Sequence, residues 1–156
     1  MALGRQIPAT GVLSDRPSGP LAPRSSGAGG TAQGVTAPLS SAPAVAGVAS
    51  VALPLPPNGQ VFLVQRIAIS TTSTQATTCA VYVGTPGDLS PANLIDYSYD
   101  GNADIADESS PILVPGGQTL TLVWSSMSAG SVGSARVQYL VTDPATANAI
   151  LTGKAN

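Results

Sequence analysis

The chain has 156 residues, of which 9% are charged, and its formal net charge is −2. Soluble proteins usually carry charge on about 25% of their residues, so this composition favours a surface largely covered by neighbouring proteins. The six basic residues form no dense patch with interleaved aromatic side chains, which argues against nucleic-acid binding by a folded domain.

Residues 1–44 are predicted to form an extended arm. They consist mainly of Gly, Ala, Ser, Thr and Pro, which bury too little apolar surface to offset the entropy lost on ordering the backbone. We therefore expect the arm to take its shape on a partner. The candidate partner-binding residues are Arg5, Arg16 and Arg24. An acidic protein surface is favoured over a phosphate backbone, which usually recruits denser positive charge.

Residues 45–142 have the pattern of an all-β domain, in which short runs rich in β-branched residues are separated by turn residues. The predicted strands span residues 45–53, 60–71, 77–84, 93–99, 112–114, 118–125 and 134–142. No helical run separates them, so an antiparallel sandwich is predicted rather than a parallel α/β sheet. In the fourth strand the two faces differ, with Leu94, Asp96 and Ser98 opposite Ile95, Tyr97 and Tyr99.

Residues 143–156 are predicted to form a tail with one short helix. Asp143 can cap it, Pro144 suits its first position, and Gly153 suits its end. A helix this short is marginal alone and must dock on the domain or on a neighbour, through a narrow stripe formed by Ala147, Ile150 and Leu151.

The residue types argue against an enzyme, and no cofactor is expected. There is no histidine and only one cysteine, Cys79, so Ser–His and Cys–His nucleophile pairs, zinc sites and intrachain disulfides are excluded. Cys79 is interpreted as a small core residue. No secretory signal or membrane span is predicted, because the most apolar early window, residues 45–55, is short and broken by proline.

A few side chains admit more than one interpretation. Trp124 shares a strand face with Leu120 and Leu122, so core packing is favoured over sugar stacking. The tyrosines interpreted as rim or core residues are Tyr97, Tyr99 and Tyr139. The strand arginines are Arg66 and Arg136, which could pair with the acidic loop or with another subunit.

An acidic loop supplies the one candidate metal site. Its oxygen donors are Asp100, Asn102, Asp104, Asp107 and Glu108, and Ca²⁺ accepts six to eight such oxygens. The spacing does not match an EF-hand. The favoured interpretation is a loop whose side chains cap their own backbone, with calcium second and a carboxylate pair for glycoside hydrolysis third.

Several segments together resemble small β-sandwich virion proteins of tailed bacteriophages, especially phages of actinobacteria. The resemblance covers roughly residues 60–142 and is carried by residues 64–72, 77–84, 101–107, 110–112 and 117–124. It implies a jelly-roll-like sandwich of about seven to eight strands, with an extended N-terminal arm and a short C-terminal helix.

The resemblance also implies a function and a location. We expect a structural protein of the virion, of the capsid decoration or minor capsid type. Its partners would be the major capsid protein or other virion proteins, together with further copies of itself, trimers being one arrangement. Removal of residues 1–44 is expected to leave a folded domain that no longer joins particles. A tail or head–tail connector protein and a host-glycan-binding module are the alternatives.

Overall fold

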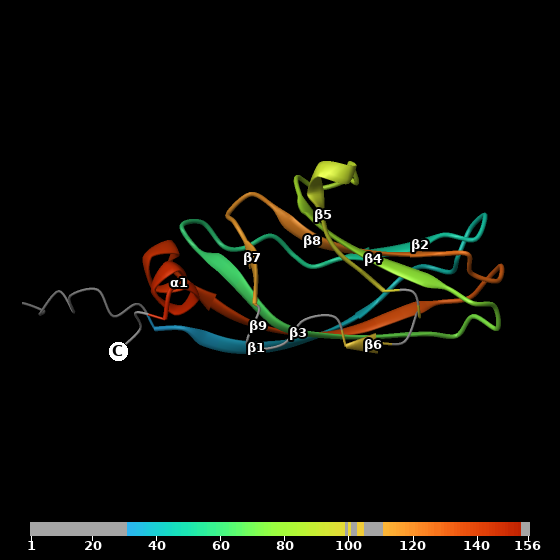
Figure 1. Ribbon diagram of the computed structural model, residues 1–156, viewed down its shortest axis with the longest axis horizontal. Helices are drawn as coiled ribbons and strands as arrows, with labels where there is room; N and C mark the ends of the chain where they lie inside the picture. Colours follow the sequence, from blue (N-terminus) through green and yellow to red (C-terminus); the bar gives the residue numbers. More distant parts are fainter. Residues whose placement is uncertain (1–30, 99, 101–102, 105–110, 154–156) are drawn as a thin grey trace, which may run out of the picture.

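The computed structural model describes residues 31–98, 100, 103–104 and 111–153, with only the backbone described for 103–104. Its strands form two antiparallel sheets that face each other, with a short helix at one end (Figure 1). The elements are β1 (Gln33–Ser40), β2 (Ala49–Ala52), β3 (Val61–Thr71), β4 (Thr78–Gly84), η2 (Pro91–Asn93), β5 (Leu94–Ser98), β6 (Ala103–Asp104), β7 (Ile112–Val114), β8 (Thr119–Ser125), β9 (Gly133–Thr142) and α1 (Pro144–Leu151).

The strand order is that of a jelly roll. One sheet runs β1-β9-β3-β6, with β7 also paired to β3, and the other runs β2-β8-β4-β5. The pairs are nested, because β1 pairs with β9, β2 with β8, β3 with β6 and β7, and β4 with β5. One long hairpin wrapped over itself gives this pattern, which distributes its strands between two packed sheets. The predicted all-β, jelly-roll-like sandwich is therefore confirmed.

The predicted boundary of the arm at residue 44 is wrong. Strand β1 lies inside that segment and pairs with β9 along its whole length, from Gln33 opposite Val141 to Ser40 opposite Ser134. Its alternate side chains pack against the core, and these are Val35, Ala37 and Leu39. Because only these three apolar residues face inward, the composition of this segment resembles that of the residues before it. The strand forms because β9 supplies the partner backbone and most of the packing surface.

The first predicted strand, residues 45–53, is shorter in the structure. Its beginning is a tight turn in which Val45 and Val48 form an isolated bridge and the two residues between them, Ala46 and Gly47, have φ angles of 51° and 80°. Positive φ at both central positions is the geometry of a hairpin turn, so pairing as β2 begins only at Ala49. The other predicted strands agree with the structure to within one residue at each end.

A single indole lies at the centre of the core. Trp124 is completely buried, and its register partners in neighbouring strands are the small residues Ala49 and Cys79. From the opposite sheet Gly133 approaches so closely that a Cβ there would overlap the indole ring. The core interpretations of Trp124 and Cys79 are thus confirmed. Tyr139 is also buried, with its ring centroid 4.5 Å from that of Phe62.

Helix α1 covers part of the outer side of β3 through two residues of its predicted apolar stripe, Ala147 and Ile150. The third, Leu151, is 41% exposed, so its predicted place in the contact is wrong. Ala147 is buried with Val61 and Leu63, and Ile150 packs against them.

The carboxylate of Asp143 accepts hydrogen bonds from the Thr146 hydroxyl, at 2.7 Å, and from the Thr146 N–H, at 2.9 Å. These bonds lower the pKa of Asp143. They also give the Thr146 N–H, in the first turn of the helix, a hydrogen-bond partner.

The contact between Gly133 and Trp124 makes a testable prediction. We expect Gly133→Ala to lower the free energy of unfolding by about 1–3 kcal/mol, because a methyl group added to a filled core displaces the indole. Gly34→Ala, on the neighbouring strand, is the control, since its Cβ would meet only Leu140 at 3.9 Å. It should change stability by less than about 0.5 kcal/mol. Urea unfolding measures both, and equal effects would contradict this packing.

The position of β1 predicts different results for two N-terminal deletions. Removing residues 1–30 should leave the unfolding free energy unchanged in a sample dilute enough to be monomeric. Removing residues 1–44 should cost roughly 3–5 kcal/mol, because Val35, Leu39 and Ala44 lose their burial and β9 loses a neighbour. The same unfolding titration distinguishes them, and a longer deletion as stable as the shorter one would show that β1 is dispensable.

Candidate interaction surfaces

The structure describes only part of the predicted acidic site. Asp100 is described, Asp104 contributes backbone to β6, and Asn102, Asp107 and Glu108 lie outside the described residues. The hydroxyl of Ser98 donates to the Asp100 carbonyl at 2.7 Å and accepts from the Asp100 N–H at 3.3 Å, a local turn. Within the described part of the chain, no group of three His, Cys, Asp or Glu is placed to hold a metal ion.

The arginines of the arm, Arg5, Arg16 and Arg24, also lie outside the described residues, so their partner contacts remain a prediction. The two strand arginines are described, and both are exposed. Arg66 lies opposite Gln138, and Arg136 lies opposite Ala68, in the paired strands β3 and β9.

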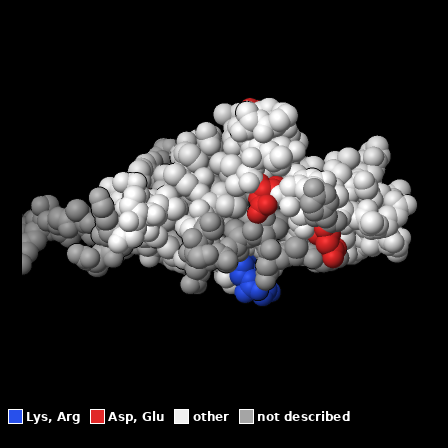
Figure 2. Space-filling model, viewed as in Figure 1, with Lys and Arg blue, Asp and Glu red and all other residues white. Residues whose placement is uncertain are grey.

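Arg66 and Arg136 are diagonal neighbours on the outer face of the β1-β9-β3 sheet. With Ala68 and Gln138 they line a hollow of about 150 Å³. Arg136 also borders an open groove of about 570 Å³, which continues over Pro38, Ser40, Ser70 and Ser134. Figure 2 shows the basic side chains at the lower edge of the molecule, separate from the acidic ones. This face is therefore polar and locally basic.

The outer face of the other sheet has a different character. In β4, Cys79 and Val81 point into the core, so Ala80 and Tyr82 point outward. Tyr97 is opposite Ala80, and Leu94 is opposite Tyr82, which places these side chains on the same outer face. Val123 of β8 is also opposite Ala80. We call Ala80, Tyr82, Leu94, Tyr97 and Val123 the tyrosine face.

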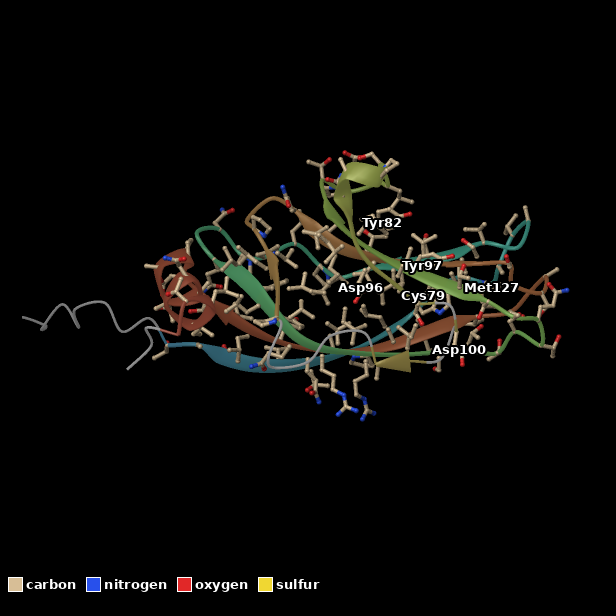
Figure 3. All side chains as sticks on the ribbon, in the orientation of Figure 1. Cys79, Tyr82, Asp96, Tyr97, Asp100 and Met127 are labelled. Carbon is tan, nitrogen blue, oxygen red and sulfur yellow. The ribbon has the colours of Figure 1, made fainter. Side chains whose placement is uncertain are left out.

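An irregularity in β5 creates this face. The register with β4 shifts between Val81 and Tyr82, so Ile95 is the extra residue on β5. Strict alternation had placed Leu94 with Asp96 and Ser98. The bulge instead puts Leu94 on the same side as Tyr97, while Asp96 and Ser98 pair with the core-facing residues of β4. Leu94, Ile95 and Tyr97 are 42%, 49% and 43% exposed, and Figure 3 labels Tyr82 and Tyr97 on this sheet.

Acidic residues occur along and around β5. Asp88 lies in the loop that precedes it, Asp96 is within it, and Asp100 follows it. Asp88 accepts a hydrogen bond from the Ser90 N–H at 3.0 Å, and this bond is the main reason why its pKa is lowered. Asp88 is therefore charged at neutral pH. Asp96 accepts from the N–H of Tyr97 at 2.7 Å.

The serines at the far end of the sandwich form a structural network. The hydroxyl of Ser128 lies 2.6 Å from that of Ser131 and 3.2 Å from that of Ser73, and the Ser128 N–H donates to Ser73 Oγ at 2.9 Å. These bonds join the turn after β3 to the loop after β8. The chain has no histidine to activate any of these hydroxyls.

The remaining aromatic candidates are distributed between core and surface. Sugar stacking on Trp124 is excluded, because its side chain has no exposed area. Tyr139 is in the core and Tyr97 is at the surface, whereas Tyr99 lies outside the described residues. Sequence reasoning missed the tyrosine face because the bulge that forms it has no distinctive residue signature.

None of the helices that the structure describes has the length and apolar character needed to cross a membrane. No family model, curated protein or solved structure matches the chain.

The buried thiol gives a direct test of the core. Burial raises the pKa of Cys79 to about 12, so almost no thiolate is present at mildly alkaline pH. We expect no reaction with a disulfide reagent in the folded protein and complete reaction in denaturant. A Ser50→Cys variant, with its new thiol on an exposed position of β2, should react at once. Rapid modification of Cys79 in the folded chain would contradict its burial.

Proposed function

We propose that this protein is a non-enzymatic structural component of a bacteriophage particle, of the capsid decoration or minor capsid type. The observation that carries the proposal is the jelly roll itself, with its nested strand pairs and two outer faces of different character. Jelly rolls are frequent in viral capsids. The low charge of the chain and the resemblance of residues 60–142 to small virion sandwiches support the same function.

The proposed mechanism is mechanical. The sandwich is a preformed block, and the segment before β1 joins it at the end where α1 lies (Figure 1). An extended segment of 30 residues can reach about 100 Å, which exceeds the dimension of a small domain. Proline lowers the entropy lost when such a segment docks, and glycine allows close backbone approach. The segment would lie across neighbouring capsid subunits and hold the block in place.

The arginines of this segment supply the long-range attraction in the proposal. Residues 1–30 contain Arg5, Arg16 and Arg24 against Asp15, whereas the remaining residues contain three basic and seven acidic side chains. The segment and the domain thus carry opposite net charges. An acidic patch on a capsid subunit would attract the segment. The acidic domain would then lie on the outer side of the capsid.

A particle-binding experiment tests this function. Particles that lack the protein are incubated with the wild-type chain or with the Arg5→Ala, Arg16→Ala and Arg24→Ala triple variant. Exposed ion pairs contribute about 0.2–1 kcal/mol each, so we expect the loss of three to weaken binding by roughly three- to 150-fold. The corresponding triple lysine variant keeps the charge and should retain most of the affinity.

Occupancy on the particle distinguishes decoration from the alternatives. Many copies distributed over the capsid surface would support the proposal. A single ring at one vertex would indicate a connector or tail protein instead, and equal binding by the alanine variant would remove the role of the arginines.

A further inference from the structure

The five side chains of the tyrosine face are uncharged and mostly apolar. Leu94 and Tyr97 are exposed, Tyr82 and Val123 are half-buried, and Ala80 is buried beneath them. The rows that cross the sheet there are Ser50, Val123, Ala80 and Tyr97, and then Ala52, Thr121, Tyr82 and Leu94. Exposed contiguous apolar surfaces of this kind mark interaction sites in soluble proteins.

Strand β5 favours a partner that contacts its outer side chains over a further strand that would pair with its edge. Among the strands that the structure describes it pairs only with β4, so it is an edge strand of that sheet. Its bulge at Ile95 and its inward-directed Asp96 both oppose the addition of another strand at that edge. A partner would therefore lie across the side chains of Tyr82 and Tyr97.

The chain itself contains a segment that suits this surface. Residues 16–24 read Arg-Pro-Ser-Gly-Pro-Leu-Ala-Pro-Arg, with Pro17, Pro20 and Pro23 at every third position. A polyproline II helix has three residues per turn, so these prolines would form one ridge. Arg16 and Arg24 stand at its two ends.

The segment and the surface match in chemistry. Proline ridges in this conformation dock on aromatic side chains, and Tyr82 and Tyr97 supply two.

We propose that residues 16–24 of one chain dock, as a polyproline II helix, on the tyrosine face of a second copy. The partner is a second copy because β1 and β5 are edge strands of different sheets, on opposite sides of the sandwich. Only eight residues separate Arg24 from Gln33, the first residue of β1. That link spans about 30 Å at most and would have to pass around the sandwich to reach its own tyrosine face.

This inference specifies a contact of the arm in the proposed function, but it needs no virus particle. It concerns the isolated full-length chain in solution. Its failure would leave particle binding through the arginines intact, and loss of particle binding would leave association in solution intact.

Photo-crosslinking gives the decisive test. Tyr97 is replaced by p-benzoylphenylalanine in the full chain, and unlabelled and ¹⁵N-labelled chains are mixed before irradiation. We expect cross-links from position 97 to residues 16–24 that join one labelled and one unlabelled peptide. The same photo-reactive residue at Gln138, on the outer face of the other sheet, should give none to that segment. Cross-links only within one isotope, or only to other segments, would overturn the proposal.

Sedimentation of the full chain supplies an independent measurement. We expect concentration-dependent association that weakens at least tenfold when Pro17, Pro20 and Pro23 are replaced by alanine. Pro8→Ala, in the same arm, should leave it unchanged. Tyr97→Ala should also weaken it, and Tyr97→Phe should retain it because the ring remains. Urea midpoints show whether the variants stay folded, and a wild-type chain that remains monomeric at high concentration would contradict the proposal.

Discussion

The sandwich depends on one large side chain that only small neighbours can accommodate. Trp124 fills the space between the sheets, flanked by Ala49 and Cys79 in its own sheet and met by Gly133 from the other. Packed sheets lie about 10 Å apart, so larger residues around the indole would force it out of place. Its buried N–H has no hydrogen-bond partner among the described residues, a cost of about 1–3 kcal/mol that its packing must exceed.

Much of this fold could be predicted from the sequence because its signals are local. Alternation located β3, β4, β7, β8 and β9, and Asp143 with Pro144 located the start of α1. Strand β1 was missed because its pairing is not local. Its weakly apolar residues became a strand only through β9, about a hundred positions later, and composition alone assigned them to the arm.

The interaction surfaces were less predictable than the fold, for a related reason. The sequence correctly placed Trp124 and Cys79 in the core. It could not show that Arg66 and Arg136 are neighbours on one outer face, because that depends on the register of β3 and β9. A one-residue irregularity at Ile95 turns Leu94 outward beside Tyr97, and strict alternation cannot anticipate such a shift.

The place of β9 has a consequence for how the protein is made. It is the last strand to leave the ribosome, yet it lies between β1 and β3, both synthesised long before it. Neither earlier strand can complete its sheet during translation, so the nascent chain must remain open until synthesis of the domain is almost finished. Closure over such long loops is slow, which exposes the unfinished chain to aggregation and to chaperones.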